Sequence, residues 1–334
     1  MSTPVLEVHD LHVEVPTRRG LLHAVRGVSF QVAAGEALGL VGESGCGKSL
    51  TLRAVLDLLP HPARIVSGTV LVDGVDVTAL PRVARRRAVS AVISMVFQDP
   101  MTALNPVMRI GEQIAEVPRT RLGRSRSEAH ARALELMRQV GIPDPERRFR
   151  AYPHELSGGL RQRVVIAIAL SCEPRLLLCD EPTTALDVTI QAQVLELLRG
   201  LRRQGDLAMM LVTHDLAVVS ETCDRLAVMY AGRVVEAGSI GELVHDPHHP
   251  YTFSLLRSVP DPEQVRTRLL TIAGAPPDLV EPVTGCPFAA RCPFSRPDCD
   301  AGEPELRDVA PGRHSACRHV RPVSEWSREV EVLA

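Results

Sequence analysis

The segment Gly42–Ser49 reads GESGCGKS and fits the pattern Gly-x-x-x-x-Gly-Lys-Ser/Thr at every fixed position. It follows the apolar run Ala37–Val41, which predicts a strand, and it precedes Leu50–Leu58, which predicts a helix. Glycines let the backbone curl so that successive N–H groups face inward, and the N-terminus of the helix adds its positive end. The segment therefore predicts a phosphate-binding loop in which Lys48 meets the outer phosphates and Ser49 ligates Mg²⁺.

Lysine occurs once in this chain, at Lys48, although lysine and arginine together number 38. A compact ammonium group suits a site where the fork of a guanidinium would not fit, so the phosphate loop explains the lone lysine. Cys46 lies inside the loop at a position that tolerates variety, and we interpret its thiol as incidental.

The 334 residues are 45% hydrophobic and 23% charged, which is typical of globular proteins and excludes a disordered or low-complexity chain. A formal net charge of −2 leaves no basic field that would concentrate nucleic acid or anionic lipid. Apolar stretches such as Leu207–Val219 are interrupted before the roughly 20 apolar residues that cross a bilayer. The start, MSTPVLEVHD, lacks the features of an export signal, so we expect a cytosolic protein that binds no nucleic acid.

Short apolar runs alternate with helical patterns along the chain. The expected strands include Val5–Val8, Leu11–Val15, Val28–Val32, Thr69–Val72 and Val75–Val77, with a hairpin turn at Asp73-Gly74. One expected helix begins at Ser127 and ends before Gly141. Two more cover Arg161–Leu170 and Ile190–Arg203. This alternation predicts an α/β fold with helices on the faces of a parallel sheet. From about residue 245 the sequence turns to Pro, Cys and Arg with little periodicity, so we place a domain boundary there.

Three further apolar runs end in polar residues. Val92–Phe97 leads to Gln98, Leu176–Cys179 to Asp180-Glu181, and Met209–Val212 to Thr213-His214. Ligands of open α/β sheets bind outside the carboxyl ends of the strands, so we expect these side chains at one rim with the phosphate loop. Asp180 suits a Mg²⁺ ligand or a holder of its waters, and Glu181 is then placed to polarise an attacking water. Adjacent acids at a strand end also occur as simple turn residues.

The segment Leu156–Arg163 reads LSGGLRQR and predicts an unusual helix start. Ser157 is a good N-cap, but the two glycines that follow weaken a helix by about 0.5–1 kcal/mol each relative to alanine. A second phosphate-facing helix N-terminus would require such bare backbone.

In their order along the chain, these elements resemble the ATP-binding cassette subunit of an ABC transporter. The resemblance covers about residues 5–245 and rests on the phosphate loop, Gln98, Leu156–Gln162, Asp180-Glu181, Asp187 within TTALD, and His214. It implies a RecA-like P-loop NTPase core with an antiparallel β subdomain, an α-helical signature subdomain at about residues 101–168, and a Cys-rich C-terminal extension at 246–334. Two cassettes of this family pair head to tail, so that ATP on Lys48 of one is closed by Ser157–Gly159 of the other.

The resemblance also implies a role for each matching residue. ATP is bound by Gly42, Glu43, Ser44, Gly45, Cys46, Gly47, Lys48, Ser49 and Leu50, and Mg²⁺ by Ser49, Gln98 and Asp180. Hydrolysis involves Lys48, Gln98, Glu181 and His214, where Glu181 orients or deprotonates water and His214 contacts the γ-phosphate. The ATP of the second cassette is met by Ser157, Gly158, Gly159 and Gln162, and Asp187 forms the D-loop. The family stacks adenine on an upstream aromatic, whereas Leu11–Val15 offers only valine and Phe30 lies too late.

Several segments resemble more narrowly the oligopeptide and dipeptide import branch of this family. They are VGESGCGKS, VFQDPMTALNP at Val96–Pro106, the segment His249–Thr252, and the tail motifs Gly285–Phe288 and Arg291–Pro293. The resemblance implies an ATPase subunit that powers peptide import from the cytoplasmic face of the inner membrane. Its partners would be a second, paralogous ATPase subunit, two transmembrane permease subunits and an extracytoplasmic peptide-binding protein.

Two other functions stay open as alternatives. Nickel or another small solute is an alternative cargo, because the cassette never touches the cargo. A soluble ABC ATPase acting on ribosomes or DNA is disfavoured, because this chain carries one cassette and no sustained heptads.

Eight cysteines divide into four scattered ones and four in the tail, at Cys286, Cys292, Cys299 and Cys317. Cytosolic disulfides are uncommon, so clustered thiols suggest a metal. Four thiolates suit Zn²⁺ or an iron–sulfur cluster, although the spacings lack the close Cys-x-x-Cys of common zinc sites. Relatives with a tail of this kind imply a [4Fe–4S] cluster with a structural or redox-sensing role. Zinc, bare thiols and ligation by His314 or His319 remain alternatives.

Overall fold

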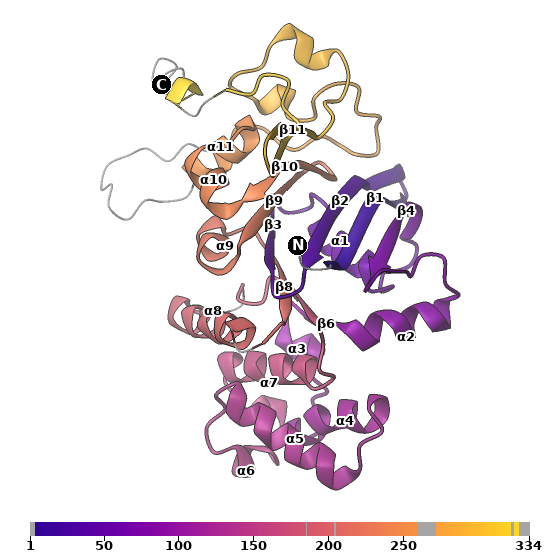
Figure 1. Ribbon diagram of the computed structural model, residues 1–334, viewed down its shortest axis with the longest axis vertical. Coiled ribbons are helices and arrows are strands. Elements are labelled where there is room, and N and C mark those ends of the chain that lie inside the picture. Colours follow the sequence, from indigo (N-terminus) through magenta and orange to yellow (C-terminus); the bar gives the residue numbers. More distant parts are fainter. Residues whose placement is uncertain (1–3, 185, 204, 259–271, 322–323, 327–334) are drawn as a thin grey trace. The chain divides into compact units, whose positions relative to one another are not determined.

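The computed structural model describes residues 4–184, 186–203, 205–258, 272–321 and 324–326 (Figure 1). The chain forms two compact units. The first contains Met1–Leu6, Val32–Glu36 and Leu71–Val212, and the second contains Glu7–Gln31, Ala37–Val70 and Thr213–Ala334. Both units combine helices with strands, which confirms the α/β class predicted from the sequence.

Three parallel strands lie side by side in the first unit: β6 (Ile93–Val96), β7 (Leu176–Asp180) and β8 (Ala208–Thr213). Every residue of β7 and β8 is buried. Parallel strands are covered on both faces, so they read as continuous apolar runs rather than as alternating patterns. The register pairs Val96 with Cys179 and Asp180 with Val212, so the carboxyl ends of the strands lie level with one another.

The rest of the first unit is mostly helical. Its elements are β5 (Val75–Asp76), α2 (Arg82–Val92), α3 (Pro100–Ala103), α4 (Ile110–Arg121), α5 (Arg126–Gln139), α6 (Pro145–Arg148), α7 (Gly158–Leu170), α8 (Val188–Arg203) and a short 3₁₀ turn at Pro153–Glu155. Helices α4, α5 and α7 pack against one another (Figure 1). They form the helical part in which the sequence predicts a signature subdomain.

Helix α5 begins at a capping box. The Ser125 hydroxyl accepts a hydrogen bond from the Glu128 N–H at 3.3 Å, and the Glu128 carboxylate accepts one from the Ser125 N–H at 2.8 Å. The helix thus starts one residue before Ser127, where the sequence predicted its start. Leu136 is fully buried on the inner face, while Leu134 is half-buried.

The second unit contains most of the strands. Its elements are β1 (Pro4–Thr17), β2 (Gly20–Ala33), β3 (Ala37–Val41), α1 (Lys48–Val55), β4 (Arg64–Val72), α9 (Leu216–Thr222), β9 (Arg225–Tyr230), β10 (Arg233–Ser239), α10 (Ile240–His245), α11 (Pro250–Arg257), β11 (Arg307–Ala310), β12 (Arg313–Ser315) and 3₁₀ turns at Ala289–Arg291 and Pro297–Asp300. Strand β3 pairs in parallel with β9, and the following neighbours β10, β12 and β11 are antiparallel. Strands β2, β1 and β4 are neighbours in a separate sheet (Figure 1).

The first strands are longer than the sequence predicts. Val5–Val8 and Leu11–Val15 are parts of one strand, β1, which continues through Asp10 with a left-handed φ of 47°. Aspartate tolerates this conformation better than most residues, so the chain bends there without ending the strand. The predicted hairpin at Asp73-Gly74 is confirmed, because Val72 pairs with Val75 across it.

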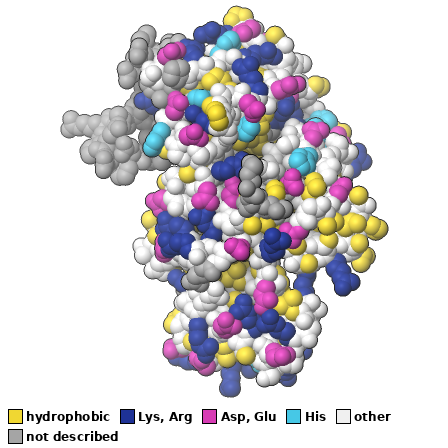
Figure 2. Space-filling model, in the orientation of Figure 1, with side chains coloured by type: hydrophobic (Ala, Val, Ile, Leu, Met, Phe, Trp, Pro, Cys, Tyr) yellow, Lys and Arg dark blue, Asp and Glu magenta, His cyan; other side chains and the backbone are white. Residues whose placement is uncertain are grey.

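No helix in the described ranges is long and apolar enough to cross a membrane. On the face of the molecule shown in Figure 2, basic and acidic side chains are interspersed. This distribution accords with the formal net charge of −2.

Replacement of Gly200 by alanine should stabilise the first unit. Gly200 lies inside α8, and a Cβ atom there would meet nothing within 4 Å. Because glycine in a helix interior costs about 0.5–1 kcal/mol relative to alanine, Gly200→Ala should raise the free energy of unfolding by about that amount. Gly111→Ala in α4 is the matched control, because its Cβ would lie 2.2 Å from the ring of Phe149. Chemical denaturation should give shifts of opposite sign, and equal shifts would contradict this packing.

Candidate functional site

The phosphate-binding loop lies between the buried strand β3 and helix α1. Gly47 precedes α1 with a left-handed φ of 105°, and a Cβ atom there would lie 2.5 Å from the carbonyl oxygen of Ala24. At Gly42 a Cβ would lie 2.1 Å from the carbonyl oxygen of Met229. Both positions therefore require glycine because a neighbouring backbone carbonyl lies too close for a side chain. The tight curl of the loop is a further reason.

The Lys48 ammonium group is folded back onto its own loop. Nζ donates hydrogen bonds to the carbonyl oxygens of Gly42 at 2.7 Å and Glu43 at 2.9 Å, and it lies 3.7 Å from Cys46 Sγ. Lys48 is 5% exposed. A cation buried against carbonyl oxygens is available to an anion that enters the loop, because phosphate oxygens are stronger acceptors than the carbonyls they would replace.

In the first unit, Gln98 and Glu181 meet at the carboxyl ends of their strands. Gln98 follows β6 and Glu181 follows β7, and the register that pairs Val96 with Cys179 brings the two side chains level. Gln98 Nε2 donates a hydrogen bond to Glu181 Oε2 at 2.9 Å. The Thr184 hydroxyl donates to the same oxygen at 3.0 Å. Two donors thus orient the carboxylate, which is the arrangement a water-activating base needs.

The residues around Glu181 have distinct environments. Asp180 ends β7 and is 3% exposed, whereas Glu181 has a left-handed φ of 45° and is partly exposed. Its N–H donates to the carbonyl oxygen of Val212 at 2.8 Å, which ties the turn to β8. Asp187 accepts a hydrogen bond from the N–H of Ile190 at 3.0 Å and so caps the start of α8.

The predicted glycine pair at the start of α7 has two different environments. Ser157 is the N-cap and accepts a hydrogen bond from the Leu160 N–H at 3.5 Å, as the sequence predicts. Gly158 is exposed, and a Cβ there would meet only Leu186, at 3.7 Å. At Gly159 a Cβ would lie 2.5 Å from Ile190 of α8. Packing within the chain therefore explains Gly159, and capping explains Ser157. At Gly158, no close contact in the described structure requires a glycine.

Two further predicted residues differ in exposure. Gln162 is 1% exposed, and its Nε2 has no hydrogen-bond partner among the described residues. His214 is exposed and lies in the second unit, one residue before Asp215, which caps α9 by accepting from the Ala217 N–H at 2.9 Å.

Sequence reasoning missed two residues that contact the phosphate loop, and a third that contacts one of them. The Tyr251 hydroxyl accepts a hydrogen bond from the Glu43 N–H at 2.9 Å, and the Glu43 carboxylate forms an ion pair with Arg291, whose guanidinium also contacts the hydroxyl of Tyr230. Tyr251 and Arg291 stood in motifs noted for resemblance alone. No periodicity or spacing in the sequence links them to Glu43.

The four tail cysteines line one pocket in the second unit, together with His249, Pro250, Phe288, Ala289, Phe294, Pro304, Arg318 and His319. Burial raises the pKa of Cys292 to about 12 and that of Cys317 to about 11, and it also raises the pKa of Cys286. Thiols with such pKa values keep their protons at neutral pH unless a metal displaces them. The pocket thus offers four sulfur ligands to a group that binds thiolates.

In the part of the chain that the structure describes, these thiols do not form a close group of three. One Zn²⁺ with Zn–S bonds of about 2.3 Å holds its sulfurs about 3.8 Å apart. Among the described residues, no three of the four thiols lie within 4.8 Å of one another. The group of possible ligands that does meet this distance is Asp298, Cys299 and His319, and His319 Nε2 lies 2.9 Å from Asp298 Oδ1.

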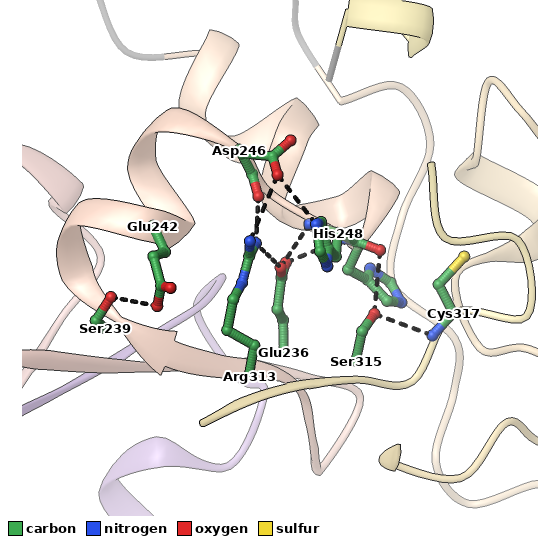
Figure 3. Close-up of polar contacts among 9 residues, drawn as sticks. Glu236, Ser239, Glu242, Asp246, His248, Arg313, Ser315 and Cys317 are labelled. Atoms are coloured by element: carbon green, nitrogen blue, oxygen red, sulfur yellow. Dashed lines mark hydrogen bonds and ion pairs between the residues drawn. The ribbon is translucent and has the colours of Figure 1, made fainter. Parts of the chain in front are cut away.

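A buried polar network supports one wall of this pocket (Figure 3). The Glu236 carboxylate, 1% exposed, accepts hydrogen bonds from the N–H groups of His248 at 2.5 Å and His249 at 3.1 Å. The Arg313 guanidinium lies 4.0 Å from Glu236 and also contacts Asp246. Ser315 links the carbonyl of His248 to the N–H of Cys317, so that the network ends at a pocket cysteine.

Glu236 should make the stability of the second unit depend on pH. Burial raises its pKa from 4.5 to about 7. Between these values the folded chain retains a proton that the unfolded chain releases, so the free energy of unfolding should fall by about 3 kcal/mol as the pH rises through this window. Glu236→Gln should remove that slope. Denaturation midpoints measured from pH 4.5 to 8 test this, and parallel profiles for the two proteins would contradict it.

Each compact unit carries features that together define a class of protein. The second unit carries a phosphate-binding loop with a buried lysine. The first unit carries a glutamate that is oriented by a glutamine, and a helix that begins with a serine N-cap followed by two glycines. Together these features are those of an ATP-binding cassette.

Comparison with known proteins agrees with this class. Residues 25–184 match the family model for ABC transporters, and residues 235–299 match the one for the oligopeptide/dipeptide transporter C-terminal region. A probable peptide ABC transporter ATP-binding protein, y4tR, of Sinorhizobium fredii is 50% identical, covering 94% of each chain. The dipeptide transport ATP-binding protein DppD of Bacillus subtilis is 49% identical, covering 89% of each chain.

Solved structures give the same result for the cassette. The dimeric ATP-binding cassette MJ0796 in a post-hydrolysis state with ADP and Pi matches with a TM-score of 0.63 and 26% identity, over 70% of this chain and 98% of that one. CbiO1 from Clostridium perfringens, part of the ABC transporter complex cbiONQ, matches with a TM-score of 0.62 and 27% identity, over 72% and 90%. The chain therefore belongs to the ATP-binding subunits of ABC transporters, in the oligopeptide/dipeptide branch. It is an ATPase that uses ATP and Mg²⁺ and couples hydrolysis to transport.

Proposed function

We propose that this chain powers the import of di- or oligopeptides by closing and reopening a pair of cassettes around ATP. The single observation that carries the chemical part is the Gln98–Glu181 hydrogen bond of 2.9 Å at the end of neighbouring parallel strands. Glu181 acts as the base that orients or deprotonates water, and Gln98 orients it. His214 contacts the γ-phosphate, while Lys48 and the loop backbone bind the phosphates. Ser49, Gln98 and Asp180 hold Mg²⁺, and the metal neutralises phosphate charge when bound.

The second ATP contact comes from a partner cassette. Ser157 and Gly158 are exposed at the N-terminus of a helix of 13 residues, where backbone N–H groups favour an anion. In a head-to-tail pair, this helix start closes the ATP held by Lys48 of the other cassette, with Gln162 and the Asp187 segment behind it. The partner is a paralogue of this chain.

The remaining partners follow from the relatives. Relatives that are about half identical to this chain are named as peptide, dipeptide or oligopeptide transport proteins, which favours two transmembrane permease subunits and an extracytoplasmic peptide-binding protein over a nickel system. The chain then lies peripherally at the cytoplasmic face of the membrane. Within it, residues 1–245 form the nucleotide-binding domain and 246–334 the extension, parts of which lie outside the described residues.

Glu181→Gln should separate ATP binding from hydrolysis. In the assembled transporter this variant should retain ATP and remain closed, while phosphate release falls at least about 100-fold because the general base is lost. Lys48→Ala should instead lose ATP retention on a filter, since the loop loses its cation. Phosphate release and bound radiolabelled ATP measure the two steps.

The matched control is Glu242→Gln, which changes an exposed glutamate of α10 and should leave both steps unaltered. In cells that lack the native copy, wild type but not Glu181→Gln should restore uptake of a labelled dipeptide. Undiminished hydrolysis by Glu181→Gln would show that Glu181 is not the general base. Restored uptake of nickel instead of a peptide would show that the cargo is nickel.

We further propose that the pocket cysteines bind a [4Fe–4S] cluster. The donor set fits, because four thiols line one pocket and four thiolates are the ligands that such a cluster takes. A cluster bound there would supply a cross-link between loops and a one-electron redox couple. Cys286, Cys292, Cys299 and Cys317 would each lose a proton on binding, against pKa values that burial raises for at least three of them.

Elemental analysis of the chain, purified without oxygen, tests this ligand. We expect about four iron atoms per chain with a broad visible absorbance, and Cys292→Ser should remove most of both. Cys172→Ser is the control, because that thiol contacts Ser94 outside the pocket. Stoichiometric zinc without iron would establish the alternative metal, and neither metal would leave four bare thiols.

A further inference from the structure

A bidentate ion pair joins the phosphate-binding loop to the C-terminal extension. Arg291 Nη1 donates to Glu43 Oε2 at 2.7 Å, and Nη2 donates to Glu43 Oε1 at 2.8 Å. Two parallel bonds of this kind are the strong and geometrically specific form of an arginine–carboxylate contact. The residues lie 248 positions apart in the sequence, in the same compact unit.

The guanidinium of Arg291 uses all five of its N–H donors. In addition to the Glu43 carboxylate, it contacts the Tyr230 hydroxyl at 3.2 Å and the carbonyl oxygens of Ala273 at 3.0 Å and Ile272 at 3.3 Å. The side chain is 6% exposed. A buried guanidinium with every donor engaged has one orientation, and lysine has no fork with which to reproduce it.

Glu43 is also fixed through its backbone. Its N–H donates to the Tyr251 hydroxyl at 2.9 Å, and its carbonyl oxygen accepts from Lys48 Nζ at 2.9 Å. Tyr251 is fully buried and packs against Tyr230, with ring centroids 4.6 Å apart. Two residues of the extension thus hold Glu43: Arg291 binds its side chain, and Tyr251 of α11 binds its N–H.

The charge of Glu43 gives this contact a consequence for ligand binding. Its carboxylate belongs to a loop that receives a polyanion, so an unpaired carboxylate there would repel the triphosphate. Arg291 cancels this charge and directs the carboxylate toward the extension. The Lys48 ammonium, which contacts the backbone of Glu43, then acts on the phosphates without a competing negative charge beside it.

We propose that Arg291 is a positioning residue for ATP binding: it fixes Glu43 and neutralises it, so that the C-terminal extension sets the nucleotide affinity of the phosphate loop. Arg291 directly precedes the pocket residue Cys292 and ends a 3₁₀ turn. A displacement of this turn would therefore be transmitted to the phosphate loop through the Arg291 side chain. This inference rests on the ATP-binding role of the loop but not on the identity of the group bound by the cysteines.

Equilibrium binding of radiolabelled MgATP to the full-length chain tests the proposal. Arg291→Met should weaken ATP binding about tenfold, and Arg291→Lys should restore only part of it, because lysine supplies charge without the fork. Glu43→Gln removes the repelling charge, so its loss of ATP affinity should be smaller than that of Arg291→Met. The decisive variant is the double substitution Glu43→Gln with Arg291→Met, which should recover most of the affinity lost by Arg291→Met.

Arg19→Met provides the matched control, because Arg19 forms an ion pair with Asp278 of the same extension but does not touch the loop. It should leave ATP affinity unchanged. Wild-type affinity in Arg291→Met would overturn the proposal. So would a double variant as weak as Arg291→Met, because a purely structural role of Arg291 predicts no rescue. Failure of the wild-type chain to bind ATP would instead overturn the proposed function itself.

Discussion

The ammonium group of Lys48, buried against the carbonyl oxygens of its own loop, is the interaction on which the rest of this protein depends. A buried cation has to be satisfied before ligand arrives, yet its partners must be weak enough for phosphate to replace them. Two carbonyl oxygens meet both conditions. The glycines that bring them into place are fixed in turn by close approach to the neighbouring backbone at Ala24 and Met229.

The placement of Gln98 and Glu181 within the first unit follows from strand register. Parallel pairing of β6 with β7 sets Gln98 level with Glu181, and pairing of β7 with β8 places Asp180 beside Val212. Strands β7 and β8 are buried throughout, so Glu181 and His214, which directly follow them, are the first residues there to reach solvent. The same geometry explains why, in the sequence, a short apolar run followed by a polar residue predicted a buried strand with a site residue at its end.

The C-terminal extension has more structure than its sequence suggests. Its four cysteines converge on one pocket from segments with little periodicity, supported by the buried Glu236 network and by Arg291, which reaches the phosphate loop. Neutral thiols are easily buried, whereas a buried guanidinium is costly unless all of its donors are engaged, as those of Arg291 are. Because Arg291 directly precedes Cys292, the cysteine pocket and the phosphate loop are joined through one residue.

The sequence by itself determined the phosphate loop, the strand ends at Gln98 and Glu181, and the helix cap at Ser157, because each depends on neighbours within a few positions. It also showed the motifs that place the chain in its family. Tertiary structure alone decided that Gly159 is bare because Ile190 packs on it, that β1 continues through Asp10, and that Arg291 pairs with Glu43. These contacts join residues far apart in the chain or depend on backbone geometry at one position, and no local pattern of residues encodes which distant side chain will fill a given space.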